Sequence, residues 1–197
     1  MKKIITKNIT YFILIALLSI VFWNFIFENI TGLKPYEKVE IFLTVESYNE
    51  ELLKSKLTND NIKGINIASC PEDDEYYMAT LQTLGIISSD ILVVTDDLVS
   101  TEGSTTSFVQ LEKEYLSTFN IILEDFELVY VDGKPYAIVV YDKNKNINLL
   151  EKYMEFSNEK EIYCIVLNNI SYHVGKYSIQ SETTTILFEI LYQLLYN

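Results

Sequence analysis

The chain has 197 residues, of which 49% are hydrophobic and 22% are charged, a composition typical of a globular protein with one core. It contains no arginine, and its formal net charge at neutral pH is −13. Such an acidic chain repels nucleic-acid phosphates and has no guanidinium group to bind them, so we expect no nucleic-acid partner.

A hydrophobic segment lies near the N-terminus. Residues 9–27 are nineteen positions without a charge, which as a helix extend about 28 Å and match the hydrocarbon core of a bilayer. Three lysines precede the segment and one glutamate follows it, which by the positive-inside rule places the N-terminus in the cytoplasm. The sequence predicts cytoplasmic residues 1–8, one transmembrane signal-anchor helix over residues 9–30 in the cell membrane, and an extracellular domain.

Two other interpretations of this segment are open. A cleaved secretory signal has an apolar region of about 7 to 15 residues that ends in small residues, whereas this segment ends in the bulky sequence FWNFIFENI. A buried core helix carries its charges on one face, and this segment has no charge to place. We therefore favour a retained anchor.

After a linker over residues 31–37, one domain extends over residues 38–197. Its first half alternates apolar runs with amphipathic stretches. The apolar runs predict three strands, over residues 39–44, 62–68 and 91–94. The amphipathic stretches between them predict two helices, over residues 48–57 and 71–84. Because parallel neighbours need crossover connections, these elements favour a parallel sheet.

The second half begins with a loop over residues 101–107, and its hydrophobic pattern then predicts helices over residues 108–119 and 183–196. Turn residues at 132–135 separate two β-rich runs and predict a hairpin. A buried strand is expected over residues 162–167. The predicted fold class is therefore α/β: three layers, with a mostly parallel sheet flanked by helices.

The order of these segments resembles the first lobe of type II extracellular solute-binding proteins of ABC importers. The segments that carry the resemblance are KVEIFLTVESY (38–48), IKGINIAS (62–69), YYMATLQTLGIISSDILVVTDDLV (76–99), GKPYAIVVYD (133–142) and IYCIVLNNISYHVGKY (162–177). The resemblance implies a single periplasmic-binding-protein-like lobe, because members of the family have two lobes and about twice this length. It also implies a small solute as ligand and an ABC permease or another envelope protein as partner.

Four ligand-binding residues follow from the resemblance by position: Thr44 and Tyr48 after the first strand, Asp96 after the third strand, and Tyr136 where the chain would cross towards a second lobe. Tyrosine can stack on a sugar face, and aspartate can accept hydrogen bonds from hydroxyl groups. The alternative is that the tyrosines pack on the sheet and that Asp96 caps a helix.

The sequence predicts no catalytic residue, no metal site and no cofactor. Cys70 and Cys164 stand 94 positions apart in no metal or redox spacing, so we expect two buried thiols, with a disulfide as the alternative. His173 is the single histidine, and we expect it in a turn, solvated or hydrogen-bonded. Acidic residues 72–75 could attract a hard cation, but such a run is usually a solvated helix start.

Three functions are compatible with these observations. The first is an anchored, non-catalytic solute-binding-like or accessory domain that works beside a transporter or envelope complex. The second is a structural domain that binds a protein partner through the exposed face of the lobe. The third is an envelope hydrolase that uses aspartate and glutamate side chains. We favour the first because it accounts for both the anchor and the resemblance.

Overall fold

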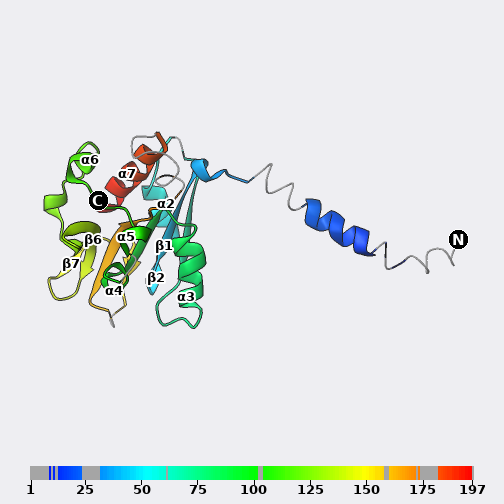
Figure 1. The fold of residues 1–197 in the computed structure, drawn as a ribbon, viewed down its shortest axis with the longest axis horizontal. Coiled ribbons are helices and arrows are strands. Elements are labelled where there is room, and N and C mark those ends of the chain that lie inside the picture. The colour runs from blue at the N-terminus through cyan, green and yellow to red at the C-terminus, as the bar shows by residue number, and fades with distance from the viewer. Residues whose placement is uncertain are drawn as a thin grey trace. The chain divides into compact units, whose positions relative to one another are not determined.

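The computed structural model describes residues 9, 11, 13–23, 32–60, 62–101, 104–157, 160–171, 173 and 182–196. The chain divides into two compact units, Met1–Lys34 and Pro35–Asn197 (Figure 1). Each unit is described by itself.

In the first unit, residues 13–23 are helical. Among the described residues, no helix combines the length and the hydrophobicity needed to cross a membrane. The transmembrane helix predicted over residues 9–30 is thus not supported by this part of the chain, although residues 10, 12 and 24–30 of that prediction lie outside the described residues. The predicted cytoplasmic residues 1–8 lie outside them as well.

The second unit is built on a mixed sheet with the strand order β3-β1-β4-β9-β6-β5, in which β7 also pairs with β6. Its strands are β1 (Lys38–Leu43), β3 (Gly64–Ser69), β4 (Ile91–Thr95), β5 (Leu128–Val131), β6 (Lys134–Asp142), β7 (Ile147–Asn148) and β9 (Ile162–Leu167). β1 pairs in parallel with β3 and β4. The pairs of β9 with β4 and β6, and of β6 with β5 and β7, are antiparallel. The first three strands of the sheet in chain order, β1, β3 and β4, therefore pair in parallel as predicted. With four antiparallel pairs against two parallel ones, however, the sheet is mixed rather than mostly parallel.

Short elements and helices complete the domain. The strands β2 (Ser47–Tyr48) and β8 (Met154–Glu155) form a separate antiparallel pair. The α-helices are α2 (Glu50–Lys56), α3 (Tyr77–Thr80), α4 (Asp96–Val99), α5 (Ser104–Ser107), α6 (Lys113–Ser117) and α7 (Glu182–Leu195). Tighter or wider helical turns are η1 (Pro35–Glu37), η2 (Leu81–Ile86) and η3 (Leu123–Asp125).

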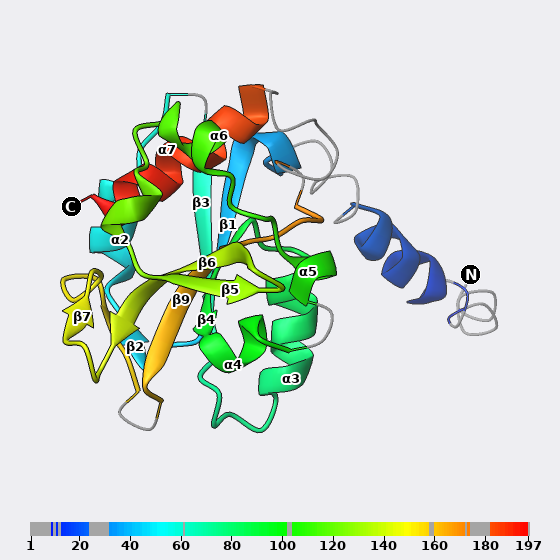
Figure 2. The same cartoon turned by 60° about the vertical axis from the view of Figure 1, so that its left-hand side comes forward.

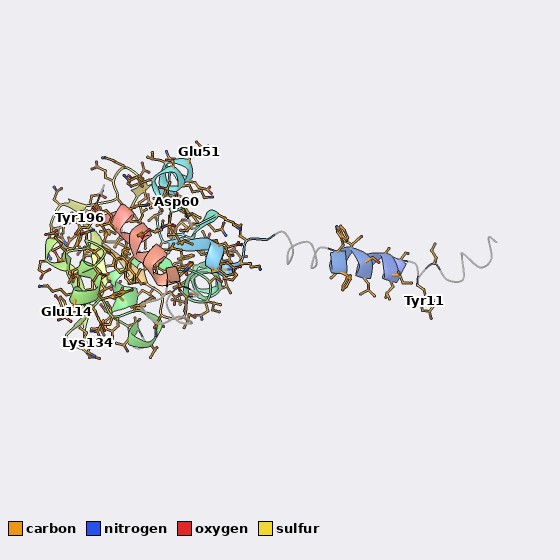
Figure 3. All side chains as sticks on the ribbon, turned by 90° about the horizontal axis from the view of Figure 1, so that it is seen from above. Tyr11, Glu51, Asp60, Glu114, Lys134 and Tyr196 are labelled. Carbon is orange, nitrogen blue, oxygen red and sulfur yellow. The ribbon has the colours of Figure 1, made fainter. Side chains whose placement is uncertain are left out.

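The sheet lies between two helical layers, as the sequence predicts. Side chains alternate along each strand, so that Ile41 and Leu43 face one core while Phe42 faces the other. The first core contains buried side chains of α2, α6 and α7, and the second contains those of α3, η2 and α4. Figure 2 shows α2 and α7 on the side of the sheet opposite α3 and α4, and Figure 3 draws the side chains of both layers.

The hairpin prediction is confirmed. Asp132 and Gly133 connect β5 to β6 and both have positive φ angles, 51° and 74°, which is typical of the two-residue turn that matches the twist of antiparallel strands. The helix predicted over residues 108–119 is largely wrong, since only α6 is helical. Phe108 instead forms a β-bridge with Asn168, and the main chain of Val109 donates a hydrogen bond to Leu167.

Candidate functional site

The carboxyl ends of the parallel strands meet at one edge of the sheet. β3 and β4 lie on opposite sides of β1. The chain that leaves β1 continues to β3 on one side, and the chain that leaves β4 continues towards β5 on the other side, so these two connections diverge. In open α/β sheets, ligands bind outside the carboxyl ends of the strands at such a point. The candidate site is therefore the edge formed by the residues that follow β1, β3 and β4.

A small cavity lies at this edge. Its volume is about 40 Å³, and it is lined by Thr44, Val45, Glu46, Pro71, Glu72, Asp73, Ser157, Lys160 and Tyr163. A water molecule needs about 10 to 15 Å³ of such space. The cavity can therefore accept water or one small group of a ligand, but not a whole sugar.

Glu72 is the centre of the polar contacts in this cavity. Its Oε1 accepts a hydrogen bond of 2.6 Å from the Thr95 hydroxyl, and its Oε2 lies 3.1 Å from Lys160 Nζ. Lys160 Nζ also lies 3.1 Å from Asp97 Oδ2, so this ammonium group bridges two carboxylates. Hydrogen bonds to Glu72 and then to Asp97 raise the pKa of Lys160, which keeps the ammonium charged. The site thus already holds one cationic group, which the chain itself supplies.

Tyr77 adds a polar atom without a partner. Its side chain is 8% exposed, and its hydroxyl oxygen is buried without a hydrogen-bond partner in the described part of the chain. The hydroxyl lies beside Glu72 and Thr44, and burial followed by the charge of Glu72 raises the pKa of Tyr77. Tyr77 does not line the cavity, and because buried polar groups are rarely left unpaired, Glu72 and Thr44 are the side chains nearest to pair with this hydroxyl.

Two of the four predicted binding residues lie at this edge. Thr44 lines the cavity, but its hydroxyl donates a hydrogen bond of 2.6 Å to the Val93 carbonyl and is thereby occupied. Asp96 is the first residue of α4, directly after β4, but Thr95 rather than Asp96 occupies the N-cap position, so Asp96 does not cap the helix as the alternative interpretation has it. Burial and then the neighbouring Asp97 raise the pKa of Asp96.

The other two predicted residues lie elsewhere. Tyr48 belongs to β2 and lines a separate depression of about 440 Å³. Tyr136 is 7% exposed and packs in the second core. The next residue of its strand, Ala137, pairs with Val166 of β9, and Val166 lies beside the start of β4. Tyr136 therefore lies towards the end of the sheet opposite to the one where Thr44 is found. The structure therefore does not gather the four residues into one site.

The cysteines are two buried free thiols, and no disulfide joins them. Burial, which is the largest cause, raises the pKa of Cys164, so this thiol is not a thiolate nucleophile at neutral pH. In the described part of the chain, no group of three or more histidine, cysteine, aspartate or glutamate side chains is placed to hold a metal ion.

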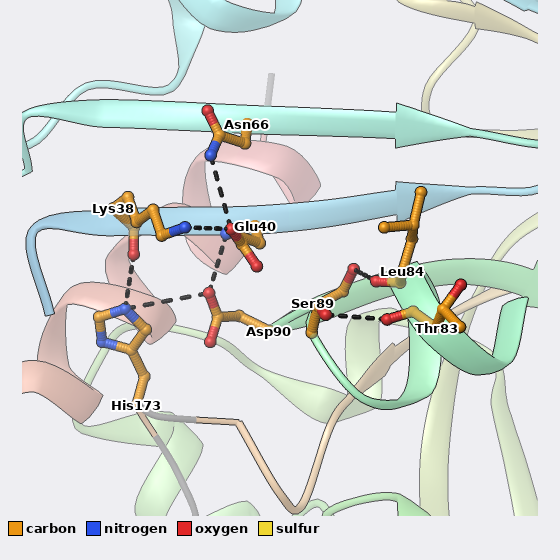
Figure 4. Close-up of polar contacts among 9 residues, drawn as sticks. Lys38, Glu40, Asn66, Thr83, Leu84, Ser89, Asp90 and His173 are labelled. Atoms are coloured by element: carbon orange, nitrogen blue, oxygen red, sulfur yellow. Dashed lines mark hydrogen bonds and ion pairs between the residues drawn. The ribbon is translucent and has the colours of Figure 1, made fainter. Parts of the chain in front are cut away.

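A second polar cluster lies at the opposite edge of the sheet and contains His173. As the second of the two predicted options has it, this side chain lies in a turn and is hydrogen-bonded; it is fully buried, and its Nε2 lies 2.8 Å from the Lys38 carbonyl and 3.9 Å from Asp90 Oδ2 (Figure 4). Nε2 must carry a hydrogen, because a carbonyl oxygen only accepts. Asp90 Oδ2 also accepts a hydrogen bond of 2.8 Å from the Glu40 main chain. The cluster ties the start of β1 to the start of β4.

Sequence reasoning missed most of the cavity. The sequence marks Glu72 only as part of an acidic helix start, although it stands four positions after the strand predicted over residues 62–68. Thr95 directly follows the strand predicted over residues 91–94. Lys160 precedes an antiparallel strand, and no local pattern connects it with Glu72, which stands 88 positions earlier.

Comparisons with known proteins give no relative of this chain. No family model, no curated protein and no solved structure matches it. The resemblance to solute-binding proteins therefore stays a prediction, and the function must be inferred from the residues of the chain itself.

Proposed function

We propose that this protein is a membrane-anchored, non-catalytic binding domain, and that it binds a cationic group at the carboxyl ends of β1, β3 and β4. The observation that carries the proposal is the bridge between Lys160 and the carboxylates of Glu72 and Asp97, beside the unpaired Tyr77 hydroxyl. Carboxylates that hold one ammonium group can hold another of the same size.

The surroundings of the cavity support a cation rather than an anion or a neutral sugar. Glu46, Glu72 and Asp73 line the cavity, whereas Lys160 is the one basic side chain among its lining residues. The domain as a whole is strongly acidic, so it attracts cations and repels anions over its surface. The cavity volume limits the bound group to an ammonium or a comparable end of a longer ligand, such as an amine or a lysine side chain.

Thermal unfolding of the full-length chain in mild detergent tests this site. Putrescine and lysine methyl ester are expected to raise the melting temperature, because a ligand that binds only the folded state stabilises it. Lys160→Ala removes the competing ammonium and should strengthen binding. Glu72→Gln should weaken binding at least about tenfold, because hydrogen bonds to a charged group are the stronger ones.

Glu75→Gln is the matched control, because it removes an exposed carboxylate of the same acidic run that does not line the cavity. It should leave the melting shift unchanged. The proposed site is wrong if no amine raises the melting temperature of the Lys160→Ala chain, or if Glu72→Gln and Glu75→Gln shift it equally.

The anchor is proposed on the nineteen uncharged residues 9–27 and the three lysines before them. After expression in a bacterium, the chain is expected in the membrane fraction, resistant to extraction with carbonate. Protease added to spheroplasts should remove the domain over residues 38–197. A soluble chain, or a domain that the protease reaches only after the cells are lysed, would contradict the proposed topology.

A place beside a transporter or envelope complex is the accompanying proposal. A cavity of about 40 Å³ cannot enclose a whole solute, so a larger ligand would be held partly by another surface. A domain with half of a binding site is suited to act together with a second protein.

A further inference from the structure

A larger groove lies on the same domain, away from the candidate site. Its volume is about 550 Å³, which is within the usual range of binding pockets. It extends between β5 and the segment before α6. Its apolar lining residues are Leu111, Leu123, Phe126, Leu128, Tyr130 and Pro135.

One wall of the groove is a free strand edge. β5 is the terminal strand of the sheet and pairs only with β6 in the described part of the chain. The Val139 main chain donates a hydrogen bond to the Glu127 carbonyl, which makes these two residues a hydrogen-bonded pair. In an antiparallel ladder such pairs alternate with pairs that point outwards, so the N–H and C=O of Leu128 point away from β6. No described residue hydrogen-bonds to the main chain of Leu128 from outside the sheet.

The edge strand β5 has no charged side chain, although it is only four residues long and its register shifts between Val129 and Tyr130. Natural proteins usually cover or charge a free edge to prevent pairing with another chain. Here Tyr130 is 60% exposed, and Leu128 is partly exposed on the edge strand itself. Exposed aromatic side chains beside a free edge favour the addition of a strand from a partner.

The charges at the groove decide which strand can add. Glu112, Glu114 and Glu124 line it, and Lys113 is the one basic lining residue and is already paired with Glu124. Figure 3 shows Glu114 on the same side of the domain as Lys134, which precedes Pro135 at the other wall. A second copy of this chain, with a net charge of −13, would bring further acidic residues to an acidic groove. Charge complementarity therefore favours a basic partner.

We propose that the groove binds an extended, basic segment of a partner protein, which adds to β5 as an antiparallel strand. An apolar side chain of this segment enters the groove, and lysine or arginine side chains two positions away contact Glu112 and Glu114. The main chain of Leu128 supplies hydrogen bonds to the segment, and the side chains give the specificity.

The test uses the synthetic peptide acetyl-TKTLTKT-amide, in which the two lysines and the leucine share one face of a strand. Its fluorescent derivative is titrated with the full-length chain in mild detergent, with the detergent alone as blank. Binding is expected to be saturable, and acetyl-TETLTET-amide should not bind. Tyr130→Lys should weaken binding at least about tenfold, because it replaces an anchoring ring with a repelling charge.

Two controls separate strand addition from simple charge attraction. Tyr76→Lys introduces the same change at a tyrosine that is 66% exposed but does not line the groove, and it should not affect binding. N-methylation of the leucine should abolish binding, because its N–H points to β5 in an antiparallel pair, whereas N-methylation of the third residue should not. The proposal is overturned if the basic peptide does not bind, if both methylated peptides bind equally, or if sedimentation shows a dimer that Tyr130→Lys dissociates.

Discussion

Asn168→Asp is expected to lower the free energy of unfolding by about 3 to 5 kcal/mol, the largest effect we expect of a single substitution in this domain. Asn168 is fully buried. Its Nδ2 donates hydrogen bonds of 2.6 Å and 2.9 Å to the carbonyls of Ile86 and Ser89, while its Oδ1 accepts one from the Ile170 main chain. An aspartate would place a buried negative charge against two carbonyl oxygens that it cannot satisfy.

Urea unfolding of the full-length chain in detergent measures this effect. Asn168→Ala should lower the free energy of unfolding by less, about 2 to 3 kcal/mol, because it leaves the carbonyls unpaired without adding a charge. The neighbouring Asn169→Asp is the control, since Asn169 is exposed and its side chain makes one hydrogen bond of 3.2 Å with the Thr106 carbonyl. A similar loss for both aspartates would show that Asn168 does not hold the end of η2 to β9.

Asp90→Ala is expected to cost about 2 to 4 kcal/mol of the free energy of unfolding. Asp90 is 4% exposed and stands at the start of β4. Without its carboxylate, the Glu40 N–H loses its acceptor, and the buried His173 loses the charge 3.9 Å from Nε2. Asp90→Asn keeps an acceptor oxygen, so it should lower the free energy of unfolding clearly less than Asp90→Ala does.

The same carboxylate makes the stability depend on pH. Burial raises the pKa of Asp90 above its ordinary value of 3.8, and the opposing effects of His173, the Glu40 N–H and Ser171 are smaller. The folded state therefore keeps the Asp90 proton to higher pH than the unfolded state does. At pH values between the ordinary and the raised pKa of Asp90, this carboxylate therefore makes the free energy of unfolding fall as the pH rises.

Asp90→Asn removes this contribution. The free energy of unfolding of the Asp90→Asn chain, minus that of the wild-type chain, should therefore increase with pH above about 4 and then level off. Urea unfolding at half-unit intervals of pH measures the difference. A difference that is constant over this range, or that decreases, would show that the pKa of Asp90 is not raised by folding.

The strands were predicted well because their signals are local. β1, β4 and β9 are buried apolar runs between turn residues, and the pair Asp132-Gly133 identifies its hairpin without any tertiary information. The parallel half of the sheet followed from the helices between the strands. The antiparallel direction of β9 could not be predicted in the same way, because no residue pattern within the strand indicates which strands it pairs with.

The failures were tertiary in origin. Residues 108–112 have helical spacing of apolar side chains, but hydrogen bonds to Leu167 and Pro135 hold this segment extended. Tyr136 was assigned to a binding site from its place in the sequence, whereas the pleat of β6 turns it into the second core. Lys160 and Glu72 come together only because β9 returns beside β4.

The position of β9 also determines when the domain can fold during synthesis. β9 is the last strand in sequence among the described residues, yet it lies in the interior of the sheet and is flanked by two strands that are made earlier. Until residues 162–167 have left the ribosome, β4 and β6 therefore lack their common neighbour and expose unpaired main-chain groups. An incomplete chain of this protein is thus a candidate for chaperone binding in the interval between the synthesis of β4 and that of β9.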